Sequence, residues 1–234
     1  MLAKYFFSGL LLQMPRIDGV ESQTISEFIQ PHDVEFQSFN FNNTLHWKIK
    51  QTHTSHRAVY FVQYKMYGQN WKNKEECWGI QEDFCDLTNE TSAVRDPYYG
   101  RVKAALAGVS SGWSISSRFN PWWDTKVGPP SHIRVSRSNG LISVTFQAPN
   151  SPYKSKNGSN IPMSNYHSLS FQVYQTSAIH HTLEKKKVYE GTDTVFVIDD
   201  VAPWSSFCIR AKTHLSFLDH SSPESKETCS APVE

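Results

Sequence analysis

The sequence predicts an all-β protein built from two tandem β-sandwiches. Apolar and polar residues alternate with a period of two through many short segments, which is typical of half-buried strands, and no long segment has the 3.6-residue apolar period of a helix. Proline, glycine, asparagine and serine separate these segments, as they do in turns. At 234 residues, the chain has room for two domains of about 100 residues each.

The predicted strands fall into two groups of similar extent. Those of the first half cover residues 34–39, 45–49, 59–67 and 98–104, and those of the second half cover residues 141–146, 169–174, 194–198 and 207–212. We therefore expect one sandwich over residues 30–124 and a second over residues 125–231, joined at an elbow.

The four cysteines also divide between the two halves. Cys77 and Cys85 lie close together in the first, and Cys208 and Cys229 in the second. An even number divided in this way predicts one disulfide within each domain and an oxidising compartment. The cysteines lack the spacing of metal ligands, and an oxidised pair could not bind zinc, so we expect no metal and no cofactor.

The N-terminus resembles a secretion signal. Lys4 precedes a short apolar run that is too short to span a bilayer, and we predict a signal peptide over residues 1–20. The alternative is an apolar terminus without a targeting role. No later stretch approaches 18 consecutive apolar residues, so no membrane span is expected either.

Three glycosylation sequons agree with secretion into the extracellular space. They begin at Asn42, Asn89 and Asn157, each beside residues that favour loops. One sequon is weak evidence because chance produces many. Three of them, with paired cysteines and a signal-like start, form a consistent set.

Composition and motifs exclude several function classes. The formal net charge is +1, which argues against nucleic acid or an anionic membrane as the main partner. There is no HExxH pair, nucleophile elbow, phosphate-binding loop or dinucleotide fingerprint, so we expect no enzymatic activity. The aromatic content of 13% suits both β-sandwich cores and interface anchors.

Two local signatures sharpen the fold prediction. In sandwiches of this kind, a tyrosine near the start of the sixth strand bonds back to the preceding corner, and Tyr98 after Asp96-Pro97 fits this position. Phe207 takes the equivalent place in the second half, so that bond must be missing there. Between the domains, we expect Trp122 and Trp123 to pack into the junction. It remains open whether they instead belong to the end of the first domain.

Several segments carry a family resemblance. They are residues 34–38, 60–69, 71–79, 98–102 and 118–123 in the first half, and residues 187–191 with both cysteines in the second. These segments resemble the ligand-binding part of class II cytokine receptors, a family that includes receptors for interferons and interleukin-10-group cytokines, and tissue factor. The resemblance covers about residues 31–230 and implies two fibronectin type III-like, immunoglobulin-like sandwiches. Phe207 and residues 180–182 depart from the pattern.

The resemblance also implies a function and a partner. The chain resembles the soluble branch of the family most. That resemblance implies a secreted decoy receptor that sequesters a helical cytokine of the interleukin-10 group, and it favours interleukin-22 within that group. Binding would be 1:1 and would block the membrane receptor. Two alternatives stay open: the ectodomain of a signalling receptor, and a cofactor or adhesion module similar to tissue factor.

The family docks its cytokine at the elbow, on loops from both domains. By this resemblance, the Tyr67-Gly68 pair after the third predicted strand inserts into the cytokine; tyrosine offers a large rigid surface, and glycine lets backbone approach closely. The alternative is that Tyr67 covers its own sheet. The further candidates, placed by loop position, are Gln69, Glu90, Thr91, Gly108, Val109, Tyr153, Tyr166, Phe217, Leu218 and Asp219.

Overall fold

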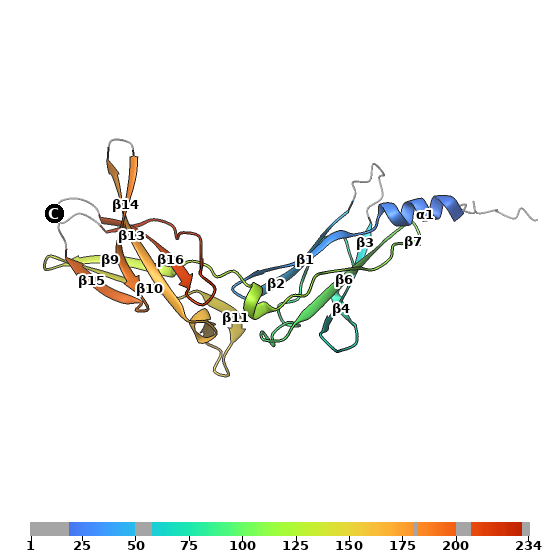
Figure 1. Ribbon diagram of the computed structural model, residues 1–234, viewed down its shortest axis with the longest axis horizontal. Coiled ribbons are helices and arrows are strands. Elements are labelled where there is room, and N and C mark those ends of the chain that lie inside the picture. Colours follow the sequence, from blue (N-terminus) through green and yellow to red (C-terminus); the bar gives the residue numbers. More distant parts are fainter. Residues whose placement is uncertain (1–18, 50–57, 180–181, 200–206, 231–234) are drawn as a thin grey trace, which may run out of the picture.

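Two β-sandwiches lie end to end along the length of the protein (Figure 1). The computed structural model describes residues 19–49, 58–179, 182–199 and 207–230. A short helix, α2 (Pro121–Asp124), lies between the two sandwiches, and a longer one, α1 (Gly19–Phe28), lies at the far end of the first. The all-β prediction of two fibronectin type III-type domains is confirmed.

The first domain consists of two antiparallel sheets. One contains β1 (His32–Phe39), β2 (Asn42–Lys48) and β5 (Phe84–Asp86) in the order β1-β2-β5. The other contains β4 (Lys72–Ile80), β3 (Val59–Met66), β6 (Tyr98–Leu106) and β7 (Val109–Ser110) in that order, with β8 (Ser114–Ile115) also paired to β6. Leu45, Val62 and Val102, all completely buried, fill the space between the sheets.

The second domain repeats this arrangement. One sheet has the order β15 (Val195–Asp199), β10 (Leu141–Gln147), β9 (Ser131–Ser138). The other has the order β14 (Thr182–Gly191), β13 (Leu169–Ile179), β16 (Phe207–Leu215), β17 (His220–Ser221), with β18 (Thr228–Ser230) also on β16. A separate ribbon, β11 (Asn150–Lys154) with β12 (Asn160–Pro162), leads into the 3-10 turn η1 (Met163–Asn165).

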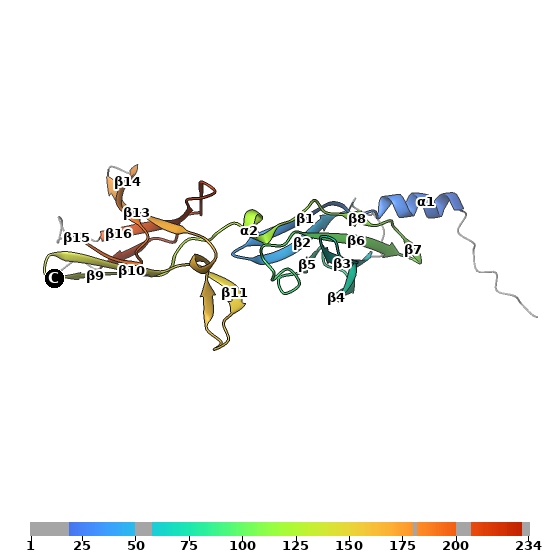
Figure 2. The same cartoon turned by 60° about the horizontal axis from the view of Figure 1, so that its bottom comes forward.

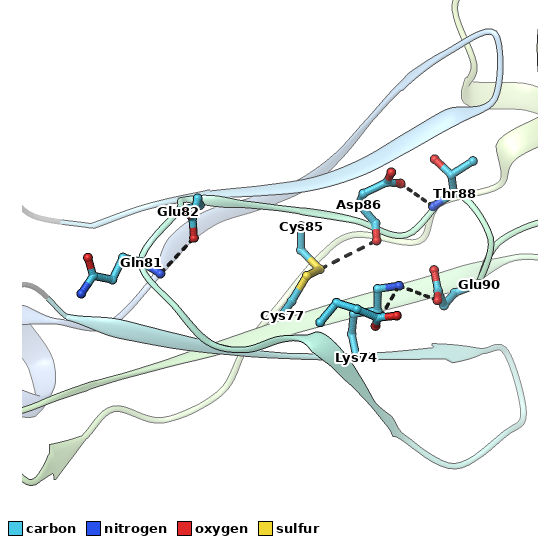
Figure 3. The surroundings of a disulfide bond; sticks show 9 residues. Lys74, Cys77, Gln81, Glu82, Cys85, Asp86, Thr88 and Glu90 are labelled. Atoms are coloured by element: carbon cyan, nitrogen blue, oxygen red, sulfur yellow. Dashed lines mark hydrogen bonds and ion pairs between the residues drawn. A yellow bond between two sulfur atoms is a disulfide. The ribbon is translucent and has the colours of Figure 1, made fainter.

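Both predicted disulfides are present, but they connect the sheets differently. Cys77–Cys85 joins β4 of one sheet to β5 of the other and is buried in the first core (Figure 3). Cys208–Cys229 joins directly opposite residues of β16 and β18, which belong to the same sheet. The first disulfide therefore fastens two layers together, and the second fastens the last described strand to its neighbour.

Helix α1 was not predicted, because its residues show no clear apolar stripe. It is fixed by contacts at its end: Ile29 is completely buried, Ser26 Oγ donates a hydrogen bond to Ser110 O at 3.0 Å, and the Gln30 carboxamide bonds the backbone of Gly112. Most of the predicted signal peptide lies outside the described residues. Its last two positions, Gly19 and Val20, belong to α1.

The tyrosine corner of the first domain is formed as predicted. The Tyr98 hydroxyl donates a hydrogen bond to the carbonyl of Ala93 at 3.3 Å, and the side chain of Tyr98 is buried at the start of β6. This bond ties the β5–β6 connection to the sheet. Because that connection faces the second domain, the corner helps to hold one side of the domain junction.

Replacing Tyr98 by phenylalanine is expected to lower the free energy of unfolding by about 1 kcal/mol, because the ring packing is kept while a half-buried hydrogen bond is lost. Chemical denaturation of the purified variant measures this. Tyr99→Phe serves as the control, since no protein partner of the Tyr99 hydroxyl is found in the described part of the chain. Equal stability of Tyr98→Phe and Tyr99→Phe would contradict the structural role of the corner.

Candidate functional site

The chain leaving the first domain runs beside the end of β1. Lys126 N donates to Ser38 O at 3.0 Å, and Asn40 N donates to Lys126 O at 2.8 Å, while the Asn40 side chain accepts from Gly128 N at 2.8 Å. These bonds attach the connection between the domains to the β1–β2 hairpin. The junction is therefore held by backbone pairing as well as by side chains.

Helix α2 carries the two tryptophans, whose rings contact each other with centroids 4.8 Å apart. Asn120 caps it through its side-chain oxygen, and Pro121 supplies the first helical position. The ring of Trp122 packs against His167 of the second domain with centroids 4.8 Å apart, whereas Trp123 is 50% exposed. The prediction that the tryptophans reach the junction is confirmed for Trp122. Viewed as in Figure 2, α2 and the β11–β12 ribbon lie on opposite sides of this junction.

Phe41 is the central side chain of the junction. It sits in the two-residue turn between β1 and β2, yet it is completely buried, in the hydrophobic cluster of the second domain. Its ring contacts Tyr166, His167 and Tyr153, with centroids 4.9, 5.8 and 6.2 Å away. The first domain thus inserts one aromatic side chain into the second.

The backbone at Phe41 is strained for a bulky residue. Asn40 and Phe41 have φ values of 49° and 65°, the positive pair that a tight hairpin turn requires. The matching hairpin of the second domain uses Asn139 and Gly140, with φ values of 52° and 73°. The left-handed conformation costs a residue with a side chain about 1–2 kcal/mol. Burial of a phenylalanine side chain contributes about 1.5–3 kcal/mol, which offsets that cost.

The Tyr67-Gly68 pair forms an exposed tip at the end of β3. Tyr67 is 68% exposed, its amide donates to Pro97 O at 2.8 Å, and Gly68 has φ 79° with open space where a side chain would point. Beside the tip lies an open hollow of about 510 Å³, lined by Lys65, Tyr67, Gly68, Trp71, Tyr99 and Ile115. Tyr67 therefore does not cover its own sheet. Most of its surface is open to solvent.

A row of stacked cations and rings supports this tip from below. The Arg101 guanidinium lies 4.2 Å from the Trp71 ring and 4.5 Å from the Trp113 ring, and it donates to Gln63 Oε1. Lys65 Nζ lies 4.8 Å from the centroid of the Trp71 ring. Each such contact is worth about 0.5–1 kcal/mol at a partly exposed site. The row fixes Trp71, which ends the Tyr67 loop.

Two candidates in the β5–β6 connection are already engaged within the protein. Lys74 Nζ lies 2.7 Å from Glu90 Oε1 and 3.2 Å from Glu76 Oε2 (Figure 3). Burial alone would lower the pKa of Lys74, but its hydrogen bonds to the two carboxylates outweigh burial and raise that pKa. Thr91 is completely buried and bonds Leu87 O. Contrary to the expectation from its loop position, the Thr91 side chain is not available to a partner.

Gly108 and Val109 lie at the wrong end of the first domain for an elbow site. β6 begins at Tyr98, paired to Phe119 where the chain leaves the domain, and ends at Leu106, which pairs with Val109. Nine residues of strand span about 26 Å. Neighbouring β3 runs antiparallel to β6, so the loops that follow these two strands must face opposite ends. The expectation for Gly108 and Val109 is therefore wrong for a site at the junction.

The second domain contributes one exposed loop tip and two rings that are mostly used internally. Phe217 is 71% exposed, and its ring lies 5.6 Å from that of Trp123, while Leu218 folds back onto the core. Tyr153 and Tyr166 pack on Phe41, and the Tyr153 hydroxyl donates to Thr88 O of the first domain at 3.3 Å. Burial raises the pKa of Tyr153.

The remaining predicted site and sequon residues lie in loops and turns, except Asn42, which begins β2. Gln69 lies in the Tyr67 loop, Asp219 is fully exposed after Leu218, and the sequon asparagines Asn42, Asn89 and Asn157 are all exposed. Sequence reasoning missed Trp123 as an exposed ring and His167 and Arg95 as junction residues. No local pattern distinguishes such residues from ordinary loop residues.

Two further features of the described residues bear on metal binding and on membrane spans. The one group of three that could approach a metal is Cys208, Glu227 and Cys229, and its two sulfurs are joined in a disulfide. Among the helices within the described ranges, none has the length and hydrophobicity to cross a bilayer.

Comparison with known proteins supplies the family. A model described as tissue factor matches residues 4–113, and one described as the interferon-alpha/beta receptor fibronectin type III domain matches residues 125–231. Interleukin-22 receptor subunit alpha-2 of Rattus norvegicus is 43% identical over 97% of this chain and 98% of its own length. The chain belongs to the class II cytokine receptor family.

Further relatives and one solved structure are similar to this class II cytokine receptor in sequence or fold. Interleukin-22 receptor subunit alpha-2 of Homo sapiens is 38% identical over 98% of both chains. Interleukin-20 receptor subunit alpha of Homo sapiens is 29% identical over 86% of this chain and 36% of its own. The crystal structure of the chicken interferon gamma receptor alpha chain shares the fold, with a TM-score of 0.61 and 22% identity over 88% of this chain and 100% of that one.

His167 is a buried titratable group at the domain junction of this receptor. The His167 ring contacts those of Phe41 and Trp122, and no hydrogen-bond partner of its Nε2 is found among the described residues. The Arg95 guanidinium lies 5.5 Å from the centroid of the Trp122 ring. Burial, and then the charge of Arg95, lowers the pKa of His167 below 6.5. The folded protein therefore keeps this imidazole neutral at a pH where the unfolded chain protonates it.

We expect the contribution of His167 to stability to be complete above pH about 6.5 and to decline as the pH falls below that value, because only the unfolded state then gains a proton. Thermal unfolding between pH 7.5 and 5 measures the decline. His167→Phe should unfold with a weaker pH dependence over this range. His220→Gln, which changes an exposed histidine of the same junction, is the control. An unchanged pH profile in His167→Phe would contradict the assignment.

Proposed function

We propose that the protein is a secreted decoy receptor that binds interleukin-22, a helical class II cytokine, and keeps it from its membrane receptor. Full-length similarity to interleukin-22 receptor subunit alpha-2 of two mammals supports the choice of cytokine. The paired cysteines and three exposed sequon asparagines support passage through the secretory pathway. No reacting group or cofactor takes part, so inhibition is competition for one face of the cytokine.

The observation that carries the proposal is the free Tyr67-Gly68 tip at the junction. An aromatic residue that is 68% exposed, next to an open hollow and a glycine that leaves backbone accessible, has the features of an interface anchor. The cytokine would cover Tyr67 and fill the adjoining hollow.

The contacts at the elbow would favour tight binding by ordering the loops in advance. Phe41, Trp122 and the paired linker fix one domain relative to the other, so that loops of both domains are ordered before binding. Less conformational entropy is then lost on association. Such preorganisation acts mainly by slowing dissociation. In the first domain, the contacts would come from Tyr67, Gly68 and Gln69; in the second, from the exposed Phe217 and Asp219.

Tyr67→Ala is expected to weaken interleukin-22 binding by about 2 kcal/mol or more, mostly through faster dissociation, because a buried aromatic anchor is removed. Surface plasmon resonance with immobilised receptor gives both rate constants. Val109→Ala, at the opposite end of the same sheet, should bind as the unchanged protein does. A loss below about 0.5 kcal/mol for Tyr67→Ala would remove this residue from the interface.

Selectivity and competition test the function itself. The protein should bind interleukin-22 more tightly than interleukin-10, -20 or -24, and it should prevent interleukin-22 from binding cells that carry the membrane receptor. Binding to another member of the group would keep the mechanism and change the ligand. A complex that still engages the membrane receptor would exclude the decoy role, and absence of binding to all four would favour the cofactor or adhesion role.

A further inference from the structure

The outward face of the β1–β2 hairpin carries an unexplained ring. Phe39 ends β1 on the solvent side, where the alternation of this strand otherwise places Glu35 and Gln37, and it is 45% exposed. Directly opposite Phe39 on β2 is Asn42, the first residue of an Asn-Asn-Thr sequon. Thr44, two residues further along the strand, points to the same face.

We propose that Asn42 carries an N-linked glycan whose first N-acetylglucosamine packs on the ring of Phe39, so that the sugar becomes part of the wall of the domain junction. This site lies outside the contacts of the cytokine proposal. It depends only on passage of the chain through the secretory pathway.

The hairpin brings the aromatic ring and the acceptor asparagine together. The residues between Phe39 and Asn42 form the tight turn, so the two side chains are opposite neighbours, about 5 Å apart at their β-carbons. Beside them lies an open hollow of about 590 Å³ whose lining includes Phe39, Asn42, Thr44, His46 and Lys126. A sugar attached to Asn42 can therefore lie over Phe39 within this hollow.

The Asn42 amide is oriented for the attachment. Its Nδ2 donates one hydrogen bond to the carbonyl of Phe39 at 2.9 Å. In the transfer, this nitrogen forms a bond to the anomeric carbon of a lipid-pyrophosphate-linked oligosaccharide, the lipid pyrophosphate leaves, and the amide loses one of its two protons. The remaining N–H is enough to keep the bond to Phe39, which would hold the sugar above the residue that it packs on.

The chemistry of the two surfaces is complementary. The C–H groups on one face of a pyranose ring are apolar and slightly positive, whereas the face of an aromatic ring is negative. Contact between them removes apolar surface of both from water. The exposed ring of Phe39 would then be covered by a partner, as an interface ring is, and that partner is the glycan of this chain.

The other side of Phe39 rests on the linker between the domains. A β-carbon at Gly128 would lie only 2.8 Å from Phe39 Cζ, so the ring occupies the space that a side chain at position 128 would need. A sugar on the outer face would confine Phe39 between the glycan and the linker. The glycan would thereby stabilise the elbow as well as the hairpin.

Asn157 provides an internal comparison. It lies between β11 and β12, where its Oδ1 accepts hydrogen bonds from the hydroxyls of Ser155 and Ser159, and no aromatic contact with it occurs in the described ranges. A glycan there would extend into solvent without packing on a ring. Loss of the Asn157 glycan should therefore not change stability.

The test uses the full chain secreted from mammalian cells. Peptide mass spectrometry determines occupancy of Asn42, and calorimetry gives Tm. Thr44→Ala, which removes the sequon, should lower Tm by about 2–4 °C, the shift that one aromatic stacking contact produces in a chain of this size. Thr44→Ser keeps the sequon and should retain both glycan and Tm. Ser159→Ala removes the Asn157 sequon and should leave Tm unchanged.

The role of the ring is tested by combining the changes. When Phe39 is replaced by alanine, the variants Thr44→Ala and Thr44→Ser should have the same Tm, because the glycan then has no ring to pack on. A further test uses the protein without any substitution. Trimming each of its glycans to a single N-acetylglucosamine should preserve Tm, because only the first sugar contacts Phe39. An unoccupied Asn42, or a loss of Tm on deglycosylation that is equal with and without Phe39, would overturn the proposal.

Discussion

The insertion of Phe41 into the second domain is the contact on which the arrangement of the two sandwiches depends. A tight hairpin turn normally ends with glycine, and the second domain follows that rule at Gly140. The first domain instead accepts a strained phenylalanine because its ring is completely buried across the junction. The linker bonds around Asn40 and Thr125 then hold the turn that carries it, since Thr125 Oγ1 accepts from Phe41 N at 2.9 Å.

The junction around Phe41 is connected through β6 to the Tyr67-Gly68 tip. The Tyr67 tip belongs to the sheet that contains β3 and β6, and β6 is joined to the junction through Tyr98, Phe119 and Trp122. The row of stacked cations and rings supports the same tip from the sheet surface. The proposed binding residues therefore extend from elements that are held by backbone pairing and packing, while Tyr98, Phe119 and Phe41 stay buried.

The strands could be predicted because alternation of apolar and polar residues reports one buried face, and this signal is local. Helix α1 could not, because it is held by a buried Ile29 and by bonds to residues about 84 positions away, such as Ser110. Tyr67 was identified by resemblance, and its exposure agrees with that role. The prediction that Gly108 and Val109 belong to a site at the elbow was wrong, because their loop position does not show at which end of the domain the loop lies. The antiparallel relation of β3 and β6 separates them, and no single segment reveals that relation.

The burial of Phe41 also has a consequence for synthesis. Phe41 is made early, but its main partners, Tyr153, Tyr166 and His167, follow more than a hundred residues later. At translation rates of about 5–20 residues per second, the first domain waits roughly 6–25 seconds for them. During that interval, a completed hairpin displays an unprotected aromatic side chain at its tip. Until the second domain emerges and covers Phe41, the nascent first domain therefore exposes an apolar side chain of the kind that chaperones recognise.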